Sequence, residues 1–253
     1  MDGLSNGAMR YFGIRTPWFT IYITQTTVTL LVASIILITL GYIIGKNLKK
    51  RPGRFQVIVE KLVNMLYGLV EGTMGKHNMK FAPYIGTLFL SSIFCTILGM
   101  TQVLRSATAD LSVTLAWALV TTGMVWYSNI KNFGFKAWLK GFTEPIVVMT
   151  PMNIVSEIAQ PISLAFRHFG NVAGGGVLTA LIYTSLGSLS SLLFGWISSS
   201  IGSIPFLQVG IPAFLSIYFD LFSGFVQALV FSLLTMVYVG AANPPPSDGE
   251  KSA

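Results

Sequence analysis

Charged side chains are scarce in this sequence: Asp, Glu, Lys and Arg make up 10% of its 253 residues, whereas hydrophobic residues make up 53%. A soluble domain carries roughly 25% charged residues, so this scarcity argues against a soluble fold. A mean hydropathy of +0.68 points in the same direction. The composition therefore indicates a membrane protein.

Cysteine and the common cofactor motifs are also nearly missing. The single cysteine, Cys95, excludes an internal disulfide and a cysteine metal cluster. The sequence contains no H-E-x-x-H, P-loop or Rossmann glycine pattern, so we expect no metal, no cofactor and no bound nucleotide on this chain. Ten-residue segments of alternating hydrophobicity are missing too, which argues against a transmembrane β-barrel. The net charge of +7 lies in short loops, where it sets membrane orientation rather than binding nucleic acid.

What the sequence has instead is long runs without charge. Five of them reach the ~20 residues that a helix needs to cross ~30 Å of hydrocarbon. They cover residues 16–45, 81–104, 111–130, 168–219 and 221–247. We therefore expect an all-α membrane protein with several spanning helices.

A basic cluster after the first run orients the chain. It comprises Lys46, Lys49, Lys50, Arg51 and Arg54. Because cytoplasmic loops are enriched in Lys and Arg, we place the cluster in the cytoplasm, residues 1–15 in an exterior tail and the first span at 16–45. The chain shows no transit peptide, so we expect a multi-pass protein of the bacterial cytoplasmic membrane with a cytoplasmic C-terminus.

Residues 55–74 carry apolar side chains at helical spacing, interrupted by polar ones. This pattern predicts an amphipathic helix on the cytoplasmic membrane surface rather than a span. Residues 81–104 then run outward, and residues 111–130 run back as the second half of a transmembrane hairpin. A lysine-rich segment follows, which this orientation places in the cytoplasm.

Two long segments, 145–197 and 205–242, precede a flexible, Pro-rich cytoplasmic tail at 243–253. Forty helical residues measure about 60 Å, which is twice the hydrocarbon thickness. Each segment is therefore either a strongly oblique helix or two shorter spans. The glycines at 174–176 would allow a break, although glycine also occurs where membrane helices approach closely.

Two glycine pairs match the small-xxx-small pattern of membrane helix packing. They are Gly41 with Gly45 and Gly170 with Gly174. We expect a neighbouring helix to lie close against both pairs.

Both long segments carry polar side chains, including three charged ones. The first stripe comprises Asn153, Glu157, Gln160, Arg167 and Asn171, and the second comprises Ser216, Asp220, Ser223, Gln227 and Thr235. Their spacing places each set on one helical face. A charged side chain in hydrocarbon costs about 2.5–3.5 kcal/mol, so both faces are candidates for a functional site.

Two interpretations of the stripes are open. Arg167 and Asp220 could form a buried ion pair that only joins two helices. A hydrated ion path would instead explain why Asn, Gln and Ser continue the stripes on both sides. His168 lies off the polar face, and we expect a packed or interfacial histidine there rather than a proton carrier.

Residues 160–176, QPISLAFRHFGNVAGGG, resemble the signature helix of subunit a of F-type ATP synthases. Three further stretches resemble that family in the same order along the chain. They are RPGRFQVIVE, SATADLSVTLAWAL and QALVFSLLTMVYVG. Together these matches cover most of the sequence.

The resemblance implies a stator subunit that lies against a rotating ring of c subunits, each with an ion-binding carboxylate at mid-membrane. Peripheral-stalk b subunits and the lipid membrane are further implied partners. The two last helices are implied to be long and oblique along the ring. ATP chemistry is implied to occur on other subunits, so this chain alone is not an enzyme. The transported ion is expected to be H⁺ rather than Na⁺.

The resemblance also implies roles for individual residues. Arg167 matches the essential arginine, Asn171 the asparagine one turn later, and Gln227 the glutamine that faces the arginine. Glu157 matches a carboxylate of the cytoplasmic half-channel, and our orientation assigns Asp220 to the exterior one. The remaining residues expected along the ion path are Gln160, Asn153, Ser223 and, off the polar face, His168.

Three positions depart from the family pattern. Gly176 stands where the family often has Glu, Asp220 where it often has His, and His168 where it usually has Leu. A single carboxylate therefore remains for the exterior half-channel.

Arginine suits the central position because a guanidinium keeps its positive charge even in hydrocarbon, whereas a lysine can lose its proton there. Such a cation stabilises the ionised form of a nearby ring carboxylate and repels ions that would cross directly between the half-channels. Two other functions fit the sequence less closely. One is a secondary transporter for a small anionic solute with Arg167 as its counter-ion, and the other is a purely structural membrane subunit.

Overall fold

The computed structural model describes residues 10–15, 20–101, 104–144, 146–195 and 217–245, and helices make up almost all of them. Five helical segments are long and apolar enough to cross a membrane. They are Gln25–Lys46, Lys76–Met100, Leu111–Phe133, Val147–Leu193 and Ser223–Ala241. The expectation of an all-α chain with several candidate spans is confirmed.

The N-terminal region differs from the expectation, because a β-hairpin precedes the first span. Strands β1 (Arg10–Arg15) and β2 (Thr20–Thr24) pair antiparallel, and helix α2 (Gln25–Lys46) starts only after them. Tyr22 and the β-branched residues around it are apolar enough to read as part of a span, yet they also favour a strand. Hydropathy alone therefore placed the start of the helix too early.

Helix α3 (Arg54–Met74) is the amphipathic helix that the sequence predicts. Its large exposed apolar side chains recur at helical spacing, and they include Phe55, Ile58, Leu62, Met65 and Leu69. Near its end, Val70 and Met74 turn into the protein and are buried. A helix with one apolar face lies well at a membrane surface.

The hairpin and its connections follow. A 3₁₀ turn, η1 (Lys76–Phe81), leads into α4 (Ala82–Met100), and a second turn, η2 (Ala107–Ala109), leads into α5 (Leu111–Phe133). A short helix that the sequence pattern did not predict, α6 (Phe135–Gly141), comes next, and the turn η3 (Val147–Met149) precedes the first long segment. Gly134, at the junction of α5 and α6, has φ of +83°, which favours glycine.

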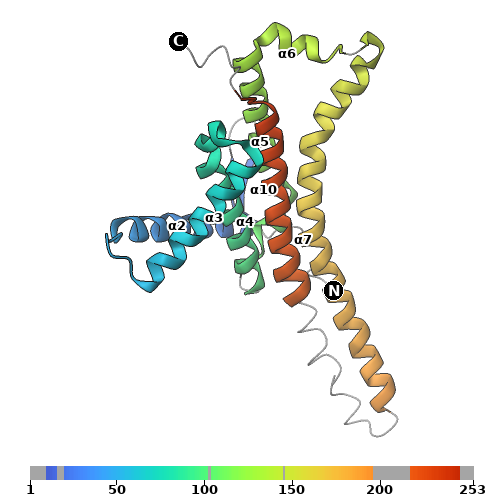
Figure 1. The fold of residues 1–253 in the computed structure, drawn as a ribbon. Coiled ribbons are helices and arrows are strands. Elements are labelled where there is room, and N and C mark those ends of the chain that lie inside the picture. The colour runs from blue at the N-terminus through green and yellow to red at the C-terminus, as the bar shows by residue number, and fades with distance from the viewer. Residues whose placement is uncertain (1–9, 16–19, 102–103, 145, 196–216, 246–253) are drawn as a thin grey trace. The chain divides into compact units, whose positions relative to one another are not determined.

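The first long segment is one helix, α7 (Thr150–Gly195), of 46 residues (Figure 1). The glycines at 174–176 do not break it, so the single-helix alternative holds for this segment. Of the second long segment, residues 205–216 lie outside the described residues. Its described part consists of a π-helical turn, η4 (Ile217–Phe222), and helix α10 (Ser223–Ala241).

The chain divides into two compact units. Unit 1 comprises Met1–Ala33, Ser92–Leu111 and Arg167–Gln227, and unit 2 comprises Ser34–Ser91, Ser112–Phe166 and Ala228–Ala253. In unit 1, the start of α2 is bonded to the loop that joins α4 and α5. Thr26 Oγ1 donates to Asp110 Oδ2 at 2.8 Å, and Thr29 Oγ1 donates to the Arg105 carbonyl at 2.9 Å.

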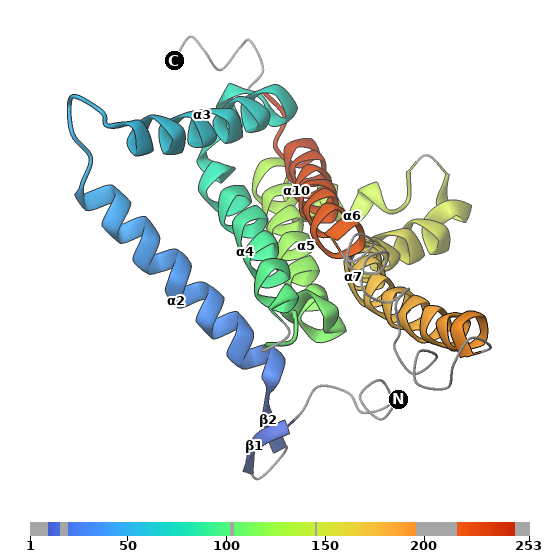
Figure 2. The same cartoon turned by 90° about the horizontal axis from the view of Figure 1, so that it is seen from below.

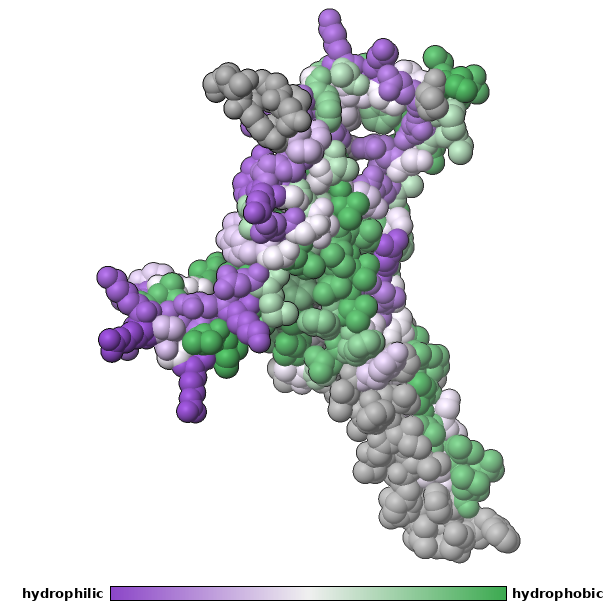
Figure 3. Space-filling view, in the orientation of Figure 1, coloured by the Kyte–Doolittle hydropathy of each residue, from purple (hydrophilic) through white to green (hydrophobic). Residues whose placement is uncertain are grey.

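Unit 2 contains an apolar core between α3, α4, α5 and α10, of which the last three run side by side in Figure 2. Val70, Ile85, Val125, Met236 and Val239 are its central buried residues. The outward surface of α10 is also apolar, and Figure 3 shows hydrophobic side chains gathered over it. A helix that is apolar on both its packed and its outward side suits a lipid environment.

The C-terminal end of α10 is held by polar contacts in unit 2. His77 Nε2 lies 2.9 Å from the Asn243 carbonyl, and Asn78 Nδ2 donates to the same oxygen at 2.9 Å. Asn132 Nδ2 donates to the Ala242 carbonyl at 2.8 Å. Asn243 is therefore buried and anchored, whereas the sequence placed it in a flexible tail; residues 246–253 of that tail lie outside the described residues.

Among the residues that the structure describes, the two glycine pairs show none of the close helix contacts expected of them. At Gly41, Gly45, Gly170 and Gly174, an added Cβ would meet no described atom within 4 Å beyond the helix itself. The small-xxx-small pattern identifies surfaces that allow close approach, but it does not say which helix uses them.

Candidate functional site

Helix α7 presents two different faces around Arg167. Pro161, Leu164, Ala165 and His168 are buried; Leu164 and Ala165 lie three and four residues after Pro161, and His168 lies three residues after Ala165. Ser163, Arg167, Gly170 and Gly174 are exposed at the same kind of interval. Residues three and four apart share a helical face, so the arginine lies on an open face that is otherwise lined by small residues.

The guanidinium of Arg167 is exposed and forms no ion pair with any side chain that the structure describes. The backbone of Asp220 lies in the π-helical turn η4, but its side chain lies outside the described part, as does Ser216. The interpretation of a simple Arg167–Asp220 pair is therefore untested.

Asn171 and Gln227 join α7 to α10 within unit 1. Asn171 Nδ2 donates to Gln227 Oε1 at 2.7 Å. Gln227 is only 2% exposed, and its Nε2 has no hydrogen-bond partner among the described residues. An unmade hydrogen bond at a buried amide costs about 1–3 kcal/mol, so this donor is a candidate to bind a group from outside the chain.

His168, next to Arg167, is fully buried and contacts α4. Its Nε2 lies 3.1 Å from Ser92 Oγ, and both side chains have 0% exposure. One turn along α4, Thr96 Oγ1 donates to the Ser92 carbonyl at 3.0 Å. Sequence reasoning missed Ser92 and Thr96, although hydroxyl residues within an apolar span are a recognised signal for helix contacts.

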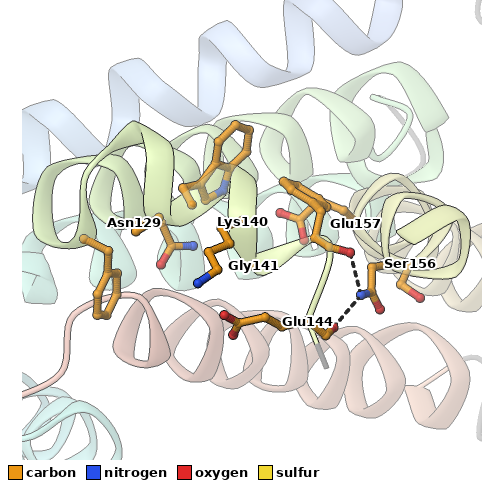
Figure 4. A pocket seen from close by; sticks show the side chains of 11 residues that line it. Asn129, Lys140, Gly141, Glu144, Ser156 and Glu157 are labelled. Atoms are coloured by element: carbon orange, nitrogen blue, oxygen red, sulfur yellow. Dashed lines mark hydrogen bonds between the residues drawn. The ribbon is translucent and has the colours of Figure 1, made fainter. Parts of the chain in front are cut away.

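Glu157 lies beside a pocket in unit 2 with a volume of about 710 Å³ (Figure 4). Trp126 Nε1 donates a short hydrogen bond to Glu157 Oε1. Lys140 and Glu144 come from the segment between α5 and α7 and line the same pocket with Glu157. A pocket with two carboxylates and a lysine is a polar space into which an ion or water can enter.

Asn153, another expected site residue, holds the wall of this pocket. Its Nδ2 donates to the Phe142 carbonyl at 2.9 Å and to the Glu144 carbonyl at 3.0 Å, as the dashed lines in Figure 4 show. Sequence reasoning found Asn153 and Glu157 from their spacing. It missed Trp126, Lys140 and Glu144, because they lie on other segments and share no periodicity with the stripe.

The remaining expected residues are placed as follows. Gln160 on α7 and Ser223 at the start of α10 are half-buried, and Thr235 is fully buried. Among the described residues, no group of three or more His, Cys, Asp or Glu side chains could hold a metal ion. Polar side chains thus recur along α7 and α10, and few of them are charged.

Sequence comparisons connect this arrangement to known proteins. The sequence model described as "ATP synthase A chain" matches residues 26–240. "ATP synthase subunit a, sodium ion specific" of Propionigenium modestum is 34% identical over 77% of this chain and 65% of its own length. This chain therefore spans just under two thirds of that relative. "ATP synthase subunit a 1" of Crocosphaera subtropica is 31% identical over 88% of this chain and 89% of its own length.

A third relative, "ATP synthase subunit a" of Desulforamulus reducens, is 32% identical over 75% of this chain and 68% of its own length. The family match includes all five candidate spans almost completely, together with Arg167, Asn171 and Gln227. On the extent of this match, the chain belongs to the ATP synthase A chain family.

Proposed function

We propose that this chain is the ion-translocating stator subunit of a rotary ATP synthase. It is a multi-pass membrane protein that lies against a ring of c subunits, while ATP is made and hydrolysed on other subunits. The observation that carries the proposal is Arg167, an exposed permanent cation on a long apolar helix. Arg167 forms no ion pair with a described side chain, and a charge without a partner is costly in hydrocarbon, so its open face calls for an anionic partner.

The small residues beside Arg167 support a helical partner. Ser163, Gly170 and Gly174 lie on the arginine's face of α7, and the two glycines leave open space beside them. A neighbouring helix can approach such a face closely. A ring of helices with mid-membrane carboxylates would bring acids past the guanidinium one after another.

The guanidinium then has two effects on a passing carboxylate. It stabilises the ionised form, so an arriving site releases its ion. It also repels a cation that would cross without the ring, and it cannot lose its own charge as a lysine could. The buried Nε2 of Gln227 is a further donor for the same carboxylate.

Two half-channels would connect this position to the two sides of the membrane. The pocket at Glu157 serves as the cytoplasmic half-channel, and Asp220 belongs to the exterior one, with Ser223 beside it. Glu157 and Arg167 both lie on α7, about 15 Å apart along its axis from the helical rise. Asn153 and Gln160 line the cytoplasmic route.

The proposed orientation has the N-terminus outside and the C-terminus in the cytoplasm of a bacterial cell, and the basic cluster at the end of α2 supports it. We propose H⁺ as the transported ion. Because the Propionigenium modestum relative is named as sodium specific, the ion must be tested directly. Peripheral-stalk b subunits and membrane lipid complete the proposed surroundings.

Cysteine cross-linking in the assembled complex tests the proposal. In a background in which Cys95 is replaced by Ala, Gly170→Cys on the open face should form a disulfide with a cysteine placed in the ring helix. Ala165→Cys on the buried face is the matched control and should not. Purification should also recover a small two-helix proteolipid in many copies with this chain. A complex without such a proteolipid, or equal cross-linking from both positions, would refute the proposed ring contact.

A further inference from the structure

Arg167 and His168 are consecutive residues with opposite surroundings. Successive side chains on an α-helix point about 100° apart, so one rotation of α7 decides the position of both. Here the arginine is exposed and the histidine has 0% exposure. Whatever fixes the rotation of α7 at His168 therefore also fixes the direction of Arg167.

A hydrogen bond fixes rotation more narrowly than apolar packing does. The other buried residues of this face, Pro161, Leu164 and Ala165, are apolar, and apolar contacts have no directional preference. His168 differs from them, because its Nε2 meets Ser92 Oγ at 3.1 Å. Hydrogen bonds weaken steeply when distance and angle depart from their optimum, so a turn of α7 would break this one.

The Ser92 side of the bond is held as well. Thr96 Oγ1 donates to the Ser92 carbonyl, and α10 approaches α4 at this level, where Gly224 lies against the Thr96 side chain. A Cβ at position 224 would overlap the Thr96 methyl group, so the approach depends on glycine. The histidine thus binds a serine on a tightly packed part of α4.

We propose that the His168–Ser92 hydrogen bond is a rotational lock that keeps Arg167 on the open face of α7. His168 is then a positioning residue for the arginine gate, and it does not carry the ion itself. This inference rests on the proposed function of Arg167. It accounts for a fully buried polar side chain at position 168.

The size of the effect follows from hydrogen bonds between membrane helices. Measured values average about 0.6 kcal/mol and reach about 1.7 kcal/mol, which correspond to factors of roughly three and twenty in an equilibrium. Loss of the bond should therefore raise the fraction of complexes with a turned α7, and with it the passive ion leak, by roughly three- to twentyfold.

The test uses the assembled complex in sealed vesicles and measures passive ion leak and ions moved per ATP hydrolysed. The variants are His168→Leu and Ser92→Ala, each with ring content verified by purification. Ser91→Ala is the matched control, because Ser91 precedes Ser92 and only the latter binds the histidine. The exchange variant, Ser92→His with His168→Ser, rebuilds the bond in the opposite direction.

The proposal expects a raised leak in His168→Leu and in Ser92→Ala. The double variant, His168→Leu with Ser92→Ala, should leak no more than either single variant, and the exchange variant should leak less than the single variants. A wild-type leak in both single variants would overturn the lock. A complete block of transport without any leak would also overturn it, since that result would make His168 part of the ion path. Arg167→Ala in the same assay separates the proposed function from the lock. If Arg167→Ala also stays coupled, the proposed function fails. If Arg167→Ala uncouples the complex but the His168 and Ser92 variants do not, only the lock is refuted.

Discussion

Asn171 Nδ2 donates a 2.7 Å hydrogen bond to Oε1 of Gln227, and this bond joins α7 to α10 one helical turn beyond Arg167. The two partners differ in their surroundings, because Asn171 is exposed whereas Gln227 is only 2% exposed. The bond therefore satisfies a buried acceptor with a donor at the edge of the site. The buried Nε2 of Gln227 has no hydrogen-bond partner among the described residues.

This asymmetry predicts unequal costs of substitution. Asn171→Leu leaves the buried Gln227 amide without its bond and should lower the free energy of unfolding by about 1–3 kcal/mol. Gln227→Leu removes the buried amide altogether and should cost less. Thermal unfolding of the two purified variants gives the comparison. A larger loss in Gln227→Leu would show that the buried amide has another stabilising role.

The sequence placed Asn171 and Gln227 each on a polar stripe with helical spacing, but it did not predict the hydrogen bond between them. It did not predict the bond between His168 and Ser92, because neither residue belongs to a stripe and a contact between α4 and α7 leaves no periodic signal. The β-hairpin before α2 was missed for a related reason. Hydropathy averages over a window and does not separate an apolar strand from the start of an apolar helix.

Gly224 should be intolerant of a side chain. Its Cβ would overlap Cγ2 of Thr96 and lie 3.2 Å from Oγ1, so Gly224→Ala should destabilise the protein by about 1–3 kcal/mol. Thr96→Ser removes the overlapping methyl group and should recover part of that loss in the double variant. Gly123→Ala in α5 is the control, since an added Cβ at Gly123 would meet no described atom within 4 Å beyond the helix. Equal melting temperatures for Gly224→Ala and Gly123→Ala would contradict the close approach.

Glu157 should limit ion transfer on the cytoplasmic side. Glu157→Gln keeps the shape of the side chain and removes its charge. We expect ATP-driven pumping to slow by about ten- to a hundredfold, which is at or below the lower limit of the rate effect of a positioned proton-transfer group. Glu144 lines the same pocket from an exposed position, so Glu144→Gln should have a much smaller effect. Pumping rates in vesicles, normalised to assembled complex, distinguish the two. Equal effects would argue against a specific role for Glu157.

Gly176 allows a direct test of the single exterior carboxylate. An added Cβ at Gly176 would meet no described atom within 4 Å beyond the helix, so Gly176→Glu should assemble. Asp220→Asn should slow ion entry from the exterior, and adding Gly176→Glu to it should restore part of the rate. Transport driven from the exterior side is the measurement. A normal rate in Asp220→Asn alone would remove Asp220 from the path.

The residues around the pocket at Glu157 could be predicted from the sequence only in part. Asn153 and Glu157 could be found because both lie on one face of α7. Trp126, which binds Glu157, and Lys140, which lines the pocket, could not be found, because they lie on α5 and α6 and only the folded chain brings them close to Glu157. The anchoring of Asn243 by Asn78 and Asn132 is similar, since it depends on three segments far apart in the sequence.

The central claim is that Arg167 separates two ion routes, and the passive ion conductance of vesicles that contain the membrane sector measures this most directly. In Arg167→Ala the account predicts a raised conductance, and ATP hydrolysis by the complete complex that no longer builds an ion gradient. Arg167→Ala vesicles that keep a wild-type gradient at the normal ratio of ions to ATP would contradict it.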